Sequence, residues 1–206
     1  GFERVYEIGK CFRNEGIDTR HNPEFTLLEL YQAYADYEDM MKMTEDMFAT
    51  VARETLGTTK VAYQGVELDF SPPWPRLSML EAIKKYAGVD WNLIKSDEEA
   101  VAFAQSRGIK VDKKATRGMV LDEICGEFVE PNLIQPTFLV DYPVEISPLA
   151  KQRKDNPELT YRFEAFIYGR ETANAFTELN DPIEQRERFM AQAREKAKGN
   201  EEAMVW

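Results

Sequence analysis

The sequence predicts an α+β protein, because strand signals and helix signals occupy separate stretches of the chain. Two segments have the pattern of a β-hairpin, with turns at Gln64–Gly65 and at Tyr168–Gly169. Apolar residues recur at helical spacing elsewhere, most clearly in residues 37–56. The 206 residues are enough for one sizeable core, and 43% hydrophobic with 31% charged residues is a globular composition.

The composition also excludes several classes of protein. The net charge of −11, from 26 basic and 37 acidic residues, argues against a non-specific nucleic-acid binder. No apolar run approaches the roughly 20 residues of a membrane helix, so no membrane partner is expected. Cys11 and Cys125 are too few for a disulfide framework and, with one histidine, for a zinc site. Their number fits a reducing compartment, and we expect a cytoplasmic protein.

A long polar loop is expected between the first two strands. Residues 4–13 alternate, and residues 25–34 form a second strand with one face made of Phe25, Leu27, Glu29 and Tyr31. The polar residues 14–22 and Pro23 between them are typical of a loop. A connection of this length between two strands is more often functional than idle.

The middle of the chain is expected to be mainly helical. An apolar stripe supports the first helix, which Gly57 would end; its members are Met40, Met41, Met47, Phe48, Val51 and Ala52. A short hairpin follows at residues 61–70. Residues 77–130 lack a catalytic cluster, and we interpret them as a helical insertion packed on the main domain. Its candidate helices are residues 78–87, 96–106 and 115–128.

The last third of the chain is expected to return to strands. Residues 133–141 form a strand interrupted by Pro136, and residues 147–150 form a turn. A second hairpin covers residues 161–178. Asp181 and the proline after it then begin a charged helix that runs to about Lys198.

A candidate anion-binding site lies at the end of the first strand. Arg13 at that position can hold a phosphate or a carboxylate through two hydrogen bonds. In the adjoining loop Glu15 can accept from an amine, and His21 can donate to a phosphate oxygen. Phe25 can stack on a base. A surface loop with an ordinary ion pair has the same residues, so both interpretations stay open.

Glu29 and Tyr31 project from the same face of the second strand. A buried carboxylate requires a cationic partner. Since no Lys or Arg lies nearby on that face, the partner could be an ammonium ligand. A basic residue of the facing strand, such as Arg4, is the competing explanation.

Two carboxylates are expected on one face of the second hairpin. With a turn at Tyr168–Gly169, Glu164 faces Ala173 and becomes a diagonal neighbour of Glu171, at roughly 7–8 Å. That spacing lets the pair hold Mg²⁺ while phosphates complete the coordination. A bulge near Ala173 would be needed to bring three further residues, of opposite parity, to the same pocket: Asn174, Phe176 and Glu178. A solvated charged hairpin is the alternative.

Taken together, these segments resemble the class II lysyl-tRNA synthetases. The run from Phe12 to Asp18, followed by the block from His21 to Thr26, closely resembles motif 2 of that family. The match continues in family order through residues 29–37, 147–150 and 174–181. Aspartyl and asparaginyl relatives share Pro-Glu-Phe-Thr but not the Glu-Leu-Tyr-Gln-Ala-Tyr-Ala-Asp-Tyr continuation, so the resemblance is specific to lysine.

The resemblance implies a role for each matching residue around ATP. Arg13 would hold the α-phosphate and the lysine carboxylate, and it would be the catalytic residue. Glu15 would accept from the adenine amino group, and Phe25 would stack on the ring. His21 would lie near the distal phosphates.

The resemblance also implies a metal site and an amino-acid pocket. Glu164 and Glu171 would bind Mg²⁺ on the ATP phosphates. Glu178 would meet the ε-ammonium of lysine, in a pocket formed with Arg13, Glu29, Tyr31, Asn174 and Phe176. Ala175, which replaces the glycine of many bacterial members, would narrow this pocket slightly.

The implied fold is an antiparallel sheet of the class II synthetase type, flanked by helices, with residues 77–130 inserted. Residues 1–206 would be the central part of the catalytic domain. Three family elements are expected outside this chain: the N-terminal OB-fold, motif 1 with its dimer interface, and motif 3 with its γ-phosphate arginine. The isolated chain would then have weak activity or none, and the full-length parent would form a homodimer.

The implied reaction joins lysine to ATP as lysyl-adenylate and transfers lysine to the 3′ end of tRNA(Lys). Two alternatives remain open at this point. One is a paralogue that transfers lysine or β-lysine to a protein, which the continuation after motif 2 disfavours. The other is a non-catalytic module that binds lysine or a nucleotide, which the intact Arg13 and Glu178 disfavour.

Overall fold

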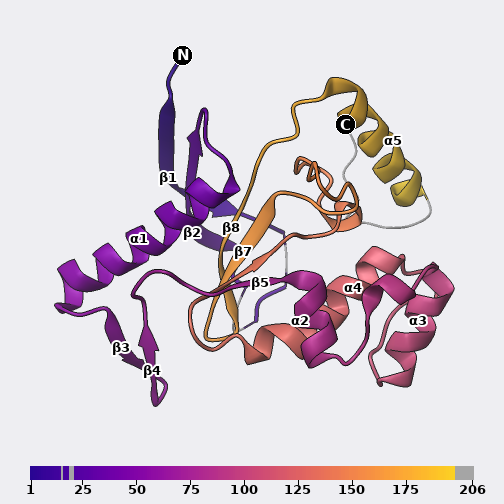
Figure 1. Ribbon diagram of the computed structural model, residues 1–206, viewed down its shortest axis with the longest axis horizontal. Helices are drawn as coiled ribbons and strands as arrows, with labels where there is room; N and C mark the ends of the chain where they lie inside the picture. Colours follow the sequence, from indigo (N-terminus) through magenta and orange to yellow (C-terminus); the bar gives the residue numbers. More distant parts are fainter. Residues whose placement is uncertain (15, 19–20, 198–206) are drawn as a thin grey trace. The chain divides into compact units, whose positions relative to one another are not determined.

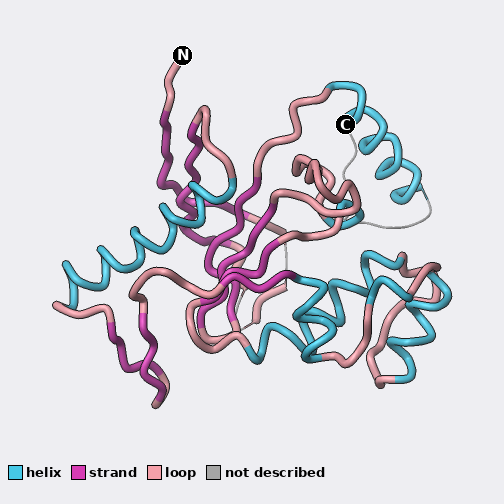
Figure 2. Tube along the Cα trace, in the orientation of Figure 1, coloured by secondary structure: helices cyan, strands magenta, loops and turns pink. Residues whose placement is uncertain are grey.

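The computed structural model describes residues 1–14, 16–18 and 21–197 (Figure 1). The chain divides into two compact units, Gly1–Ala35 and Asp36–Trp206. The α+β prediction is confirmed, with the helices and strands in the predicted order (Figure 2). Among the described residues, no helix combines the length and the apolar character that crossing a membrane demands.

The first unit is an antiparallel ribbon of β1 (Arg4–Phe12) and β2 (Glu24–Gln32). Its register runs without a shift from the Arg4–Gln32 pair to the Phe12–Glu24 pair. Because directly paired residues share a face, the predicted β2 face of Phe25 to Tyr31 lies beside the odd-numbered residues of β1.

The second unit is built on a four-stranded sheet in the order β5-β6-β7-β8. Its strands are β5 (Arg76–Ser78), β6 (Thr137–Val140), β7 (Arg162–Ile167) and β8 (Arg170–Phe176). β6, β7 and β8 pair in antiparallel fashion as expected, whereas β5 pairs with β6 in parallel. The sheet is therefore mixed at one edge.

Helix α1 (Tyr37–Leu56) packs against one face of this sheet. Its bounds agree with the prediction, and Gly57 ends it in the left-handed conformation at φ 73°. Part of the predicted apolar stripe is wrong, because Val51 is 55% exposed while Glu45 is buried. Beside α1 lies the predicted hairpin of β3 (Lys60–Tyr63) and β4 (Val66–Asp69), whose Leu68 joins the same core.

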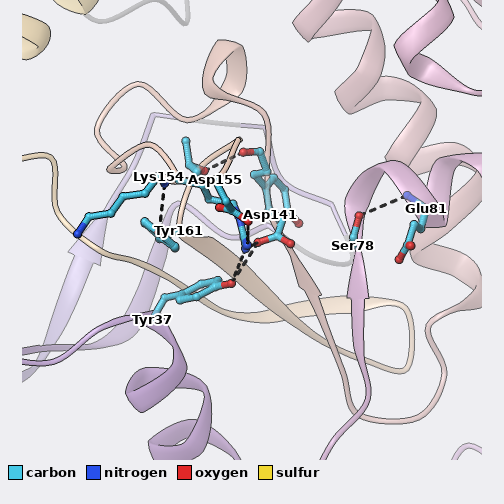
Figure 3. A network of polar contacts seen from close by, with 10 residues as sticks. Tyr37, Ser78, Glu81, Asp141, Lys154, Asp155 and Tyr161 are labelled. Atoms are coloured by element: carbon cyan, nitrogen blue, oxygen red, sulfur yellow. Dashed lines mark hydrogen bonds and ion pairs between the residues drawn. The ribbon is translucent and has the colours of Figure 1, made fainter. Parts of the chain in front are cut away.

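Tyr37 ties the start of α1 to the sheet (Figure 3). Its hydroxyl donates to Asp141 Oδ1 at 3.1 Å and accepts from Arg153 Nη1 at 3.0 Å. Arg153 also donates to Asp141 Oδ1 at 2.6 Å. Burial and the charge of Asp141 raise the pKa of the Tyr37 phenol well above its ordinary value. The phenol therefore stays neutral while it bridges the carboxylate and the guanidinium.

Three helices cover part of the other face of the sheet, where Leu139 and Phe166 point into their core. They are α2 (Met79–Tyr86), α3 (Asp97–Ser106) and α4 (Arg117–Ile124), each N-capped by a Ser or Thr hydroxyl. The predicted helix at 115–128 continues beyond α4 as a π-helical turn, Cys125–Val129. Short 3₁₀ turns cover Trp91–Leu93, Glu130–Asn132 and Val144–Ile146.

The last element is helix α5 (Pro182–Ala197), which begins as predicted after Asp181. Asp181 Oδ1 accepts from the backbone N–H groups of Ile183 and Glu184 at 2.9 and 3.2 Å. These bonds satisfy two of the helix donors that lack an intrahelical partner, so Asp181 acts as the N-cap.

Candidate active site

In the first unit, Arg13 lies over Phe25. The guanidinium carbon is 5.0 Å from the centre of the ring, which is cation–π geometry. The backbone N–H of Arg13 also donates to Pro23 O at 2.9 Å, so the loop closes beside this pair. Two residues that the sequence analysis placed in one ATP site therefore lie together.

The loop after β1 is shaped by a residue that the sequence analysis did not single out. Asp18 accepts from the backbone N–H of His21 at 2.7 Å and lies 2.9 Å from His21 Nδ1. The backbone N–H of Asp18 in turn donates to His21 O at 3.1 Å. Asp18 thereby orients the His21 ring. Glu15, predicted to bind adenine, lies outside the described residues.

Glu29 lies directly opposite Glu7 in the ribbon. The alternative in which Arg4 is the partner of Glu29 is wrong, because Arg4 pairs with Gln32 and projects from the other face of the ribbon. The premise that Glu29 is buried is also wrong, since its side chain is exposed. Tyr31 lies opposite Val5 and is likewise exposed. The face therefore presents two neighbouring carboxylates.

In the second unit, Glu164 is held at both carboxylate oxygens. Tyr142 donates its hydroxyl to Oε2 at 2.7 Å, and Arg162 Nη2 donates to Oε1 at 2.5 Å. The Arg162 guanidinium also lies 4.5 Å from the centre of the Tyr142 ring. Tyr142 is fully enclosed and Glu164 mostly so. This geometry fixes the direction in which Glu164 presents its remaining lone pairs.

Glu171 lies on the same face as Glu164, as predicted. It pairs with Phe166, two residues along β7 from Glu164. Desolvation and the charge of Glu164 raise the pKa of Glu171 to about 7, although Arg162 opposes the shift and part of the side chain still meets solvent. A carboxyl group with a raised pKa beside another carboxylate is stabilised in its charged form by a bound cation.

A bulge brings Asn174 and Phe176 to the same face. The predicted pairing of Glu164 with Ala173 is wrong: Glu164 pairs with Asn174, and Ala173 pairs with Ala165. The register shifts at this point, so Thr172 is the extra residue of β8. The bulge that was predicted to be needed near Ala173 is therefore present. Arg162 Nε donates to Asn174 Oδ1 at 3.2 Å across the two strands.

Glu178 lies just beyond β8 and is held by its backbone. It forms an isolated antiparallel bridge with Ala150, so the segments at 147–150 and 177–179 are neighbours. Desolvation raises the pKa of Glu178. Both segments were selected from the sequence, and the fold places them side by side.

Ala175 does not narrow the pocket, contrary to the expectation. It pairs with Phe163, and its side chain packs against the core on the α1 side of the sheet. Because side chains alternate along a strand, this is the face opposite to Asn174 and Phe176.

Tyr142 and Arg162 were missed by the sequence analysis. Tyr142 lies outside β6 and β7, and its partner Glu164 is 22 residues away. Arg162 carries a signal in the sequence, since it precedes Glu164 by two residues in a predicted strand and therefore shares its face. A hollow of about 350 Å³ elsewhere in this unit, lined by Arg76, Lys85 and Thr137 among others, contains none of the predicted site residues.

The donor set fits Mg²⁺ only with help from a substrate. Within the described parts of the chain, no group of three or more His, Cys, Asp or Glu side chains could hold a metal ion. Glu164 and Glu171 nevertheless offer two carboxylates on one face. Mg²⁺ in nucleotide sites is commonly held by one or two carboxylates, with phosphates and water completing an octahedron. The pair therefore suits a metal that arrives with phosphates.

Comparison with known proteins agrees with this fold. Residues 1–205 match the family model of the tRNA synthetases class II (D, K and N). The chain belongs to this family of class II tRNA synthetases, as the motif 2 resemblance predicted.

Within the family, the chain is similar to bacterial lysine–tRNA ligases. It is 63% identical to that of Moorella thermoacetica, 60% to that of Pelotomaculum thermopropionicum and 57% to that of Clostridium tetani. These matches cover 98–100% of the chain but only 40–42% of each relative. The chain thus spans about two fifths of the length of these relatives.

Proposed function

We propose that this chain is part of a lysine–tRNA ligase, which activates lysine with ATP and then charges tRNA(Lys). The observation that carries the proposal is the acidic face of β7 and β8, where Glu164, Glu171 and Asn174 lie together and Glu178 follows. Lysine carries two ammonium groups and ATP carries Mg²⁺, so this substrate pair suits a concentration of carboxylates. The similarity to lysine–tRNA ligases supports the same substrates.

The proposed chemistry is two successive substitutions. A lysine carboxylate oxygen attacks the α-phosphorus of ATP, the bond to the β-phosphate oxygen breaks, and pyrophosphate leaves. A hydroxyl of the terminal tRNA ribose then attacks the carbonyl carbon of lysyl-adenylate, and AMP leaves. Since no covalent bond to the protein is needed, positioning and charge stabilisation carry the reaction.

The first unit supplies the proposed nucleotide contacts. Arg13 binds the α-phosphate and stabilises the charge that develops during attack. Phe25 stacks on the adenine, Glu15 accepts from its amino group, and His21, oriented by Asp18, meets the distal phosphates. In this proposal the Arg13 guanidinium leaves the Phe25 ring when the adenine takes its place. Glu29 and Tyr31 contact the amino acid.

The second unit supplies the proposed metal and lysine contacts. Glu164 and Glu171 hold Mg²⁺, which neutralises phosphate charge when bound. Arg162 and Tyr142 keep Glu164 in a fixed orientation for this purpose. Asn174 and Phe176 contact lysine, and Glu178 accepts from its ε-ammonium.

We further propose that residues 1–206 are the central part of a catalytic domain and that residues 77–130 are an insertion in it. The three helices of that stretch share one core, which is consistent with a unit added to the sheet. The full-length protein is proposed to act as a cytoplasmic homodimer.

The test is amino-acid-dependent exchange of pyrophosphate into ATP. The chain, extended at both ends to the length of its relatives, would be assayed with lysine, aspartate, asparagine and β-lysine in the presence of Mg²⁺. Exchange with lysine alone is the expected result. A preference for β-lysine would support a paralogue that modifies a protein, and no exchange from folded protein would support a non-catalytic binding module.

A further inference from the structure

The loop at residues 147–150 fixes the backbone of Glu178. Regular pairing of β8 ends at Phe176. Thr177 N still donates to Tyr161 O at 2.9 Å, and beyond that point the backbone of the segment bonds to residues 149–151. Lys151 N donates to Thr177 O at 2.8 Å, and Leu179 N donates to Leu149 O at 3.0 Å. These two bonds flank Glu178 on both sides. A shift of the loop would therefore shift the Glu178 side chain.

A single guanidinium from α5 holds the loop. Arg188 Nη1 donates to three loop carbonyls: Ser147 O at 3.2 Å, Pro148 O at 3.3 Å and Ala150 O at 2.7 Å. The Arg188 side chain is only 10% exposed, and Nη2 pairs with Glu184 one turn earlier. An arginine enclosed to this extent is tolerated in a folded protein where acceptors match its N–H donors.

The same loop is held from the site side by a second arginine. Arg162 Nη1 donates to Ile146 O at 2.7 Å and to Ser147 Oγ at 3.0 Å. Arg162 is the residue that also contacts Glu164 and Asn174. The loop is thus fixed at Ser147 by two guanidinium groups, one on the face of the carboxylates and one on α5.

The helix is attached through half-buried side chains, Phe189 among them, and through this polar contact. Among the described side chains of α5, none is fully buried, and most of the helix is polar. A surface helix normally docks through an apolar stripe. Here the enclosed Arg188 makes three hydrogen bonds to one loop, which indicates that orienting this loop is part of what the helix does.

We propose that Arg188 is a positioning residue for amino-acid recognition: it holds the loop at 147–150, and through it the Glu178 carboxylate, in the place where the lysine ammonium binds. The inference rests on the proposed function, in which Glu178 meets that ammonium. Arg188 itself touches no substrate. Glu164 and Glu171 lie on β7 and β8, and Tyr142 holds Glu164 without contacting this loop, so we expect ATP and metal binding to change little.

The test compares Arg188→Gln with Arg188→Lys and with a matched control, Arg186→Gln. Arg186 is an exposed residue of the same helix, and its substitution changes the charge equally. Steady-state pyrophosphate exchange in the extended protein would give KM for lysine, KM for ATP and kcat. Hydrogen exchange would report the amides of Lys151 and Leu179, which donate across the loop.

We expect Arg188→Gln to raise KM for lysine about tenfold with KM for ATP within about twofold, since a displaced binding group costs affinity for its own ligand. The Lys151 and Leu179 amides should lose protection, Arg188→Lys should recover part of both effects, and Arg186→Gln should change neither. An unchanged KM for lysine in a folded Arg188→Gln protein would overturn the inference, and so would equal losses for lysine and ATP. Absence of lysine-dependent exchange in the unsubstituted protein would instead overturn the proposed function.

Discussion

The hydroxyl of Thr172 donates to the carbonyl oxygen of Ala165 at 3.0 Å, and this pair marks the bulge between β8 and β7. On the side of the bulge nearer the hairpin turn, Glu171 pairs with Phe166. On the other side of the bulge, Asn174 pairs with Glu164. Without the extra residue, Asn174 and Phe176 would point into the core on the α1 side. One extra residue in β8 therefore decides which side chains join the carboxylates.

The first prediction concerns the identity of this extra residue. Deleting Thr172 leaves a regular ladder in which Ala173 still faces Ala165 toward the core. Deleting Ala173 instead gives a chain of the same length as the first deletion, but Thr172 then faces Ala165 and its hydroxyl points toward the core. We expect the second deletion to be less stable than the first by about 1–2 kcal/mol, the usual cost of enclosing a hydroxyl. Denaturant unfolding of both chains measures the difference, and equal stabilities would place the bulge elsewhere.

The second prediction separates the two carboxylates of the proposed metal site. In metal-free buffer the folded protein binds the Glu171 proton more tightly than the unfolded chain, since the pKa of Glu171 is raised from its ordinary 4.5 to about 7. Stability should therefore fall as the pH rises from about 4.5 to 7 and change no further from this group above that range. The variant Glu171→Gln should lose this part of the pH dependence.

The matched variant Glu164→Gln removes a charge that raises the pKa of Glu171, so it should reduce this pH dependence but keep the larger part that desolvation of Glu171 causes. It weakens charged hydrogen bonds from Arg162 and Tyr142, so we expect a loss of about 1–3 kcal/mol at pH 7. Unfolding curves with chelator present, at several pH values, check both variants. If the two substitutions gave the same pH profile, the different environments of the two carboxyls would be refuted.

Local signals made much of the fold predictable. Helix α1 has an N-cap, an apolar repeat and a glycine stop in consecutive sequence, and its predicted bounds agree with the structure. The turn at Tyr168 and Gly169 was predictable from the glycine, because glycine readily adopts the positive φ, here 67°, that such a turn requires. Such features depend on residues that are close in the chain.

The remaining features depend on contacts between distant segments. Glu45 has the spacing of a surface residue but is enclosed, because Arg76 and Trp74 reach it from 31 and 29 residues away. Likewise, the contact of Arg188 with Ser147 joins α5 to a loop 41 residues earlier. Periodicity places a residue on a face of its own element, but only the packed chain decides what lies opposite.

The third prediction tests the proposed role of Arg13. Its side chain contacts Phe25 on an exposed strand end, so Arg13→Ala should change the unfolding free energy by no more than about 0.5–1 kcal/mol. The rate of adenylation should fall far more, by about 100-fold or greater, because a group that stabilises transition-state charge is lost. Pyrophosphate exchange and thermal melting of the extended protein give the two numbers. Losses of similar size in both would make Arg13 a structural residue.

The fourth prediction concerns Glu178. The variant Glu178→Gln keeps the shape of the side chain but removes its charge, and we expect lysine binding to weaken by about 1–3 kcal/mol. Glu127→Gln, a change of the same kind in the helical stretch, serves as a control. Calorimetric titration with lysine measures both. Unchanged affinity in the Glu178 variant would remove that residue from the proposed pocket.

The last prediction concerns the enclosed Glu45 of α1. Its Oε2 accepts from Trp74 N at 2.8 Å and from Arg76 Nη1 at 3.2 Å, while Oε1 accepts from Arg76 Nη2 at 3.2 Å. In Glu45→Gln an amide donor must face one of these donors, so one hydrogen bond becomes a repulsive contact.

We expect this substitution to cost about 1–3 kcal/mol. At about 2–4 °C per kcal/mol for a chain of this size, the melting temperature should fall measurably. Glu54→Gln, at an exposed position of the same helix, should leave it within about 1 °C, since surface changes of this kind are nearly neutral. Equal shifts in the two variants would mean that the contacts of Glu45 contribute nothing beyond its charge.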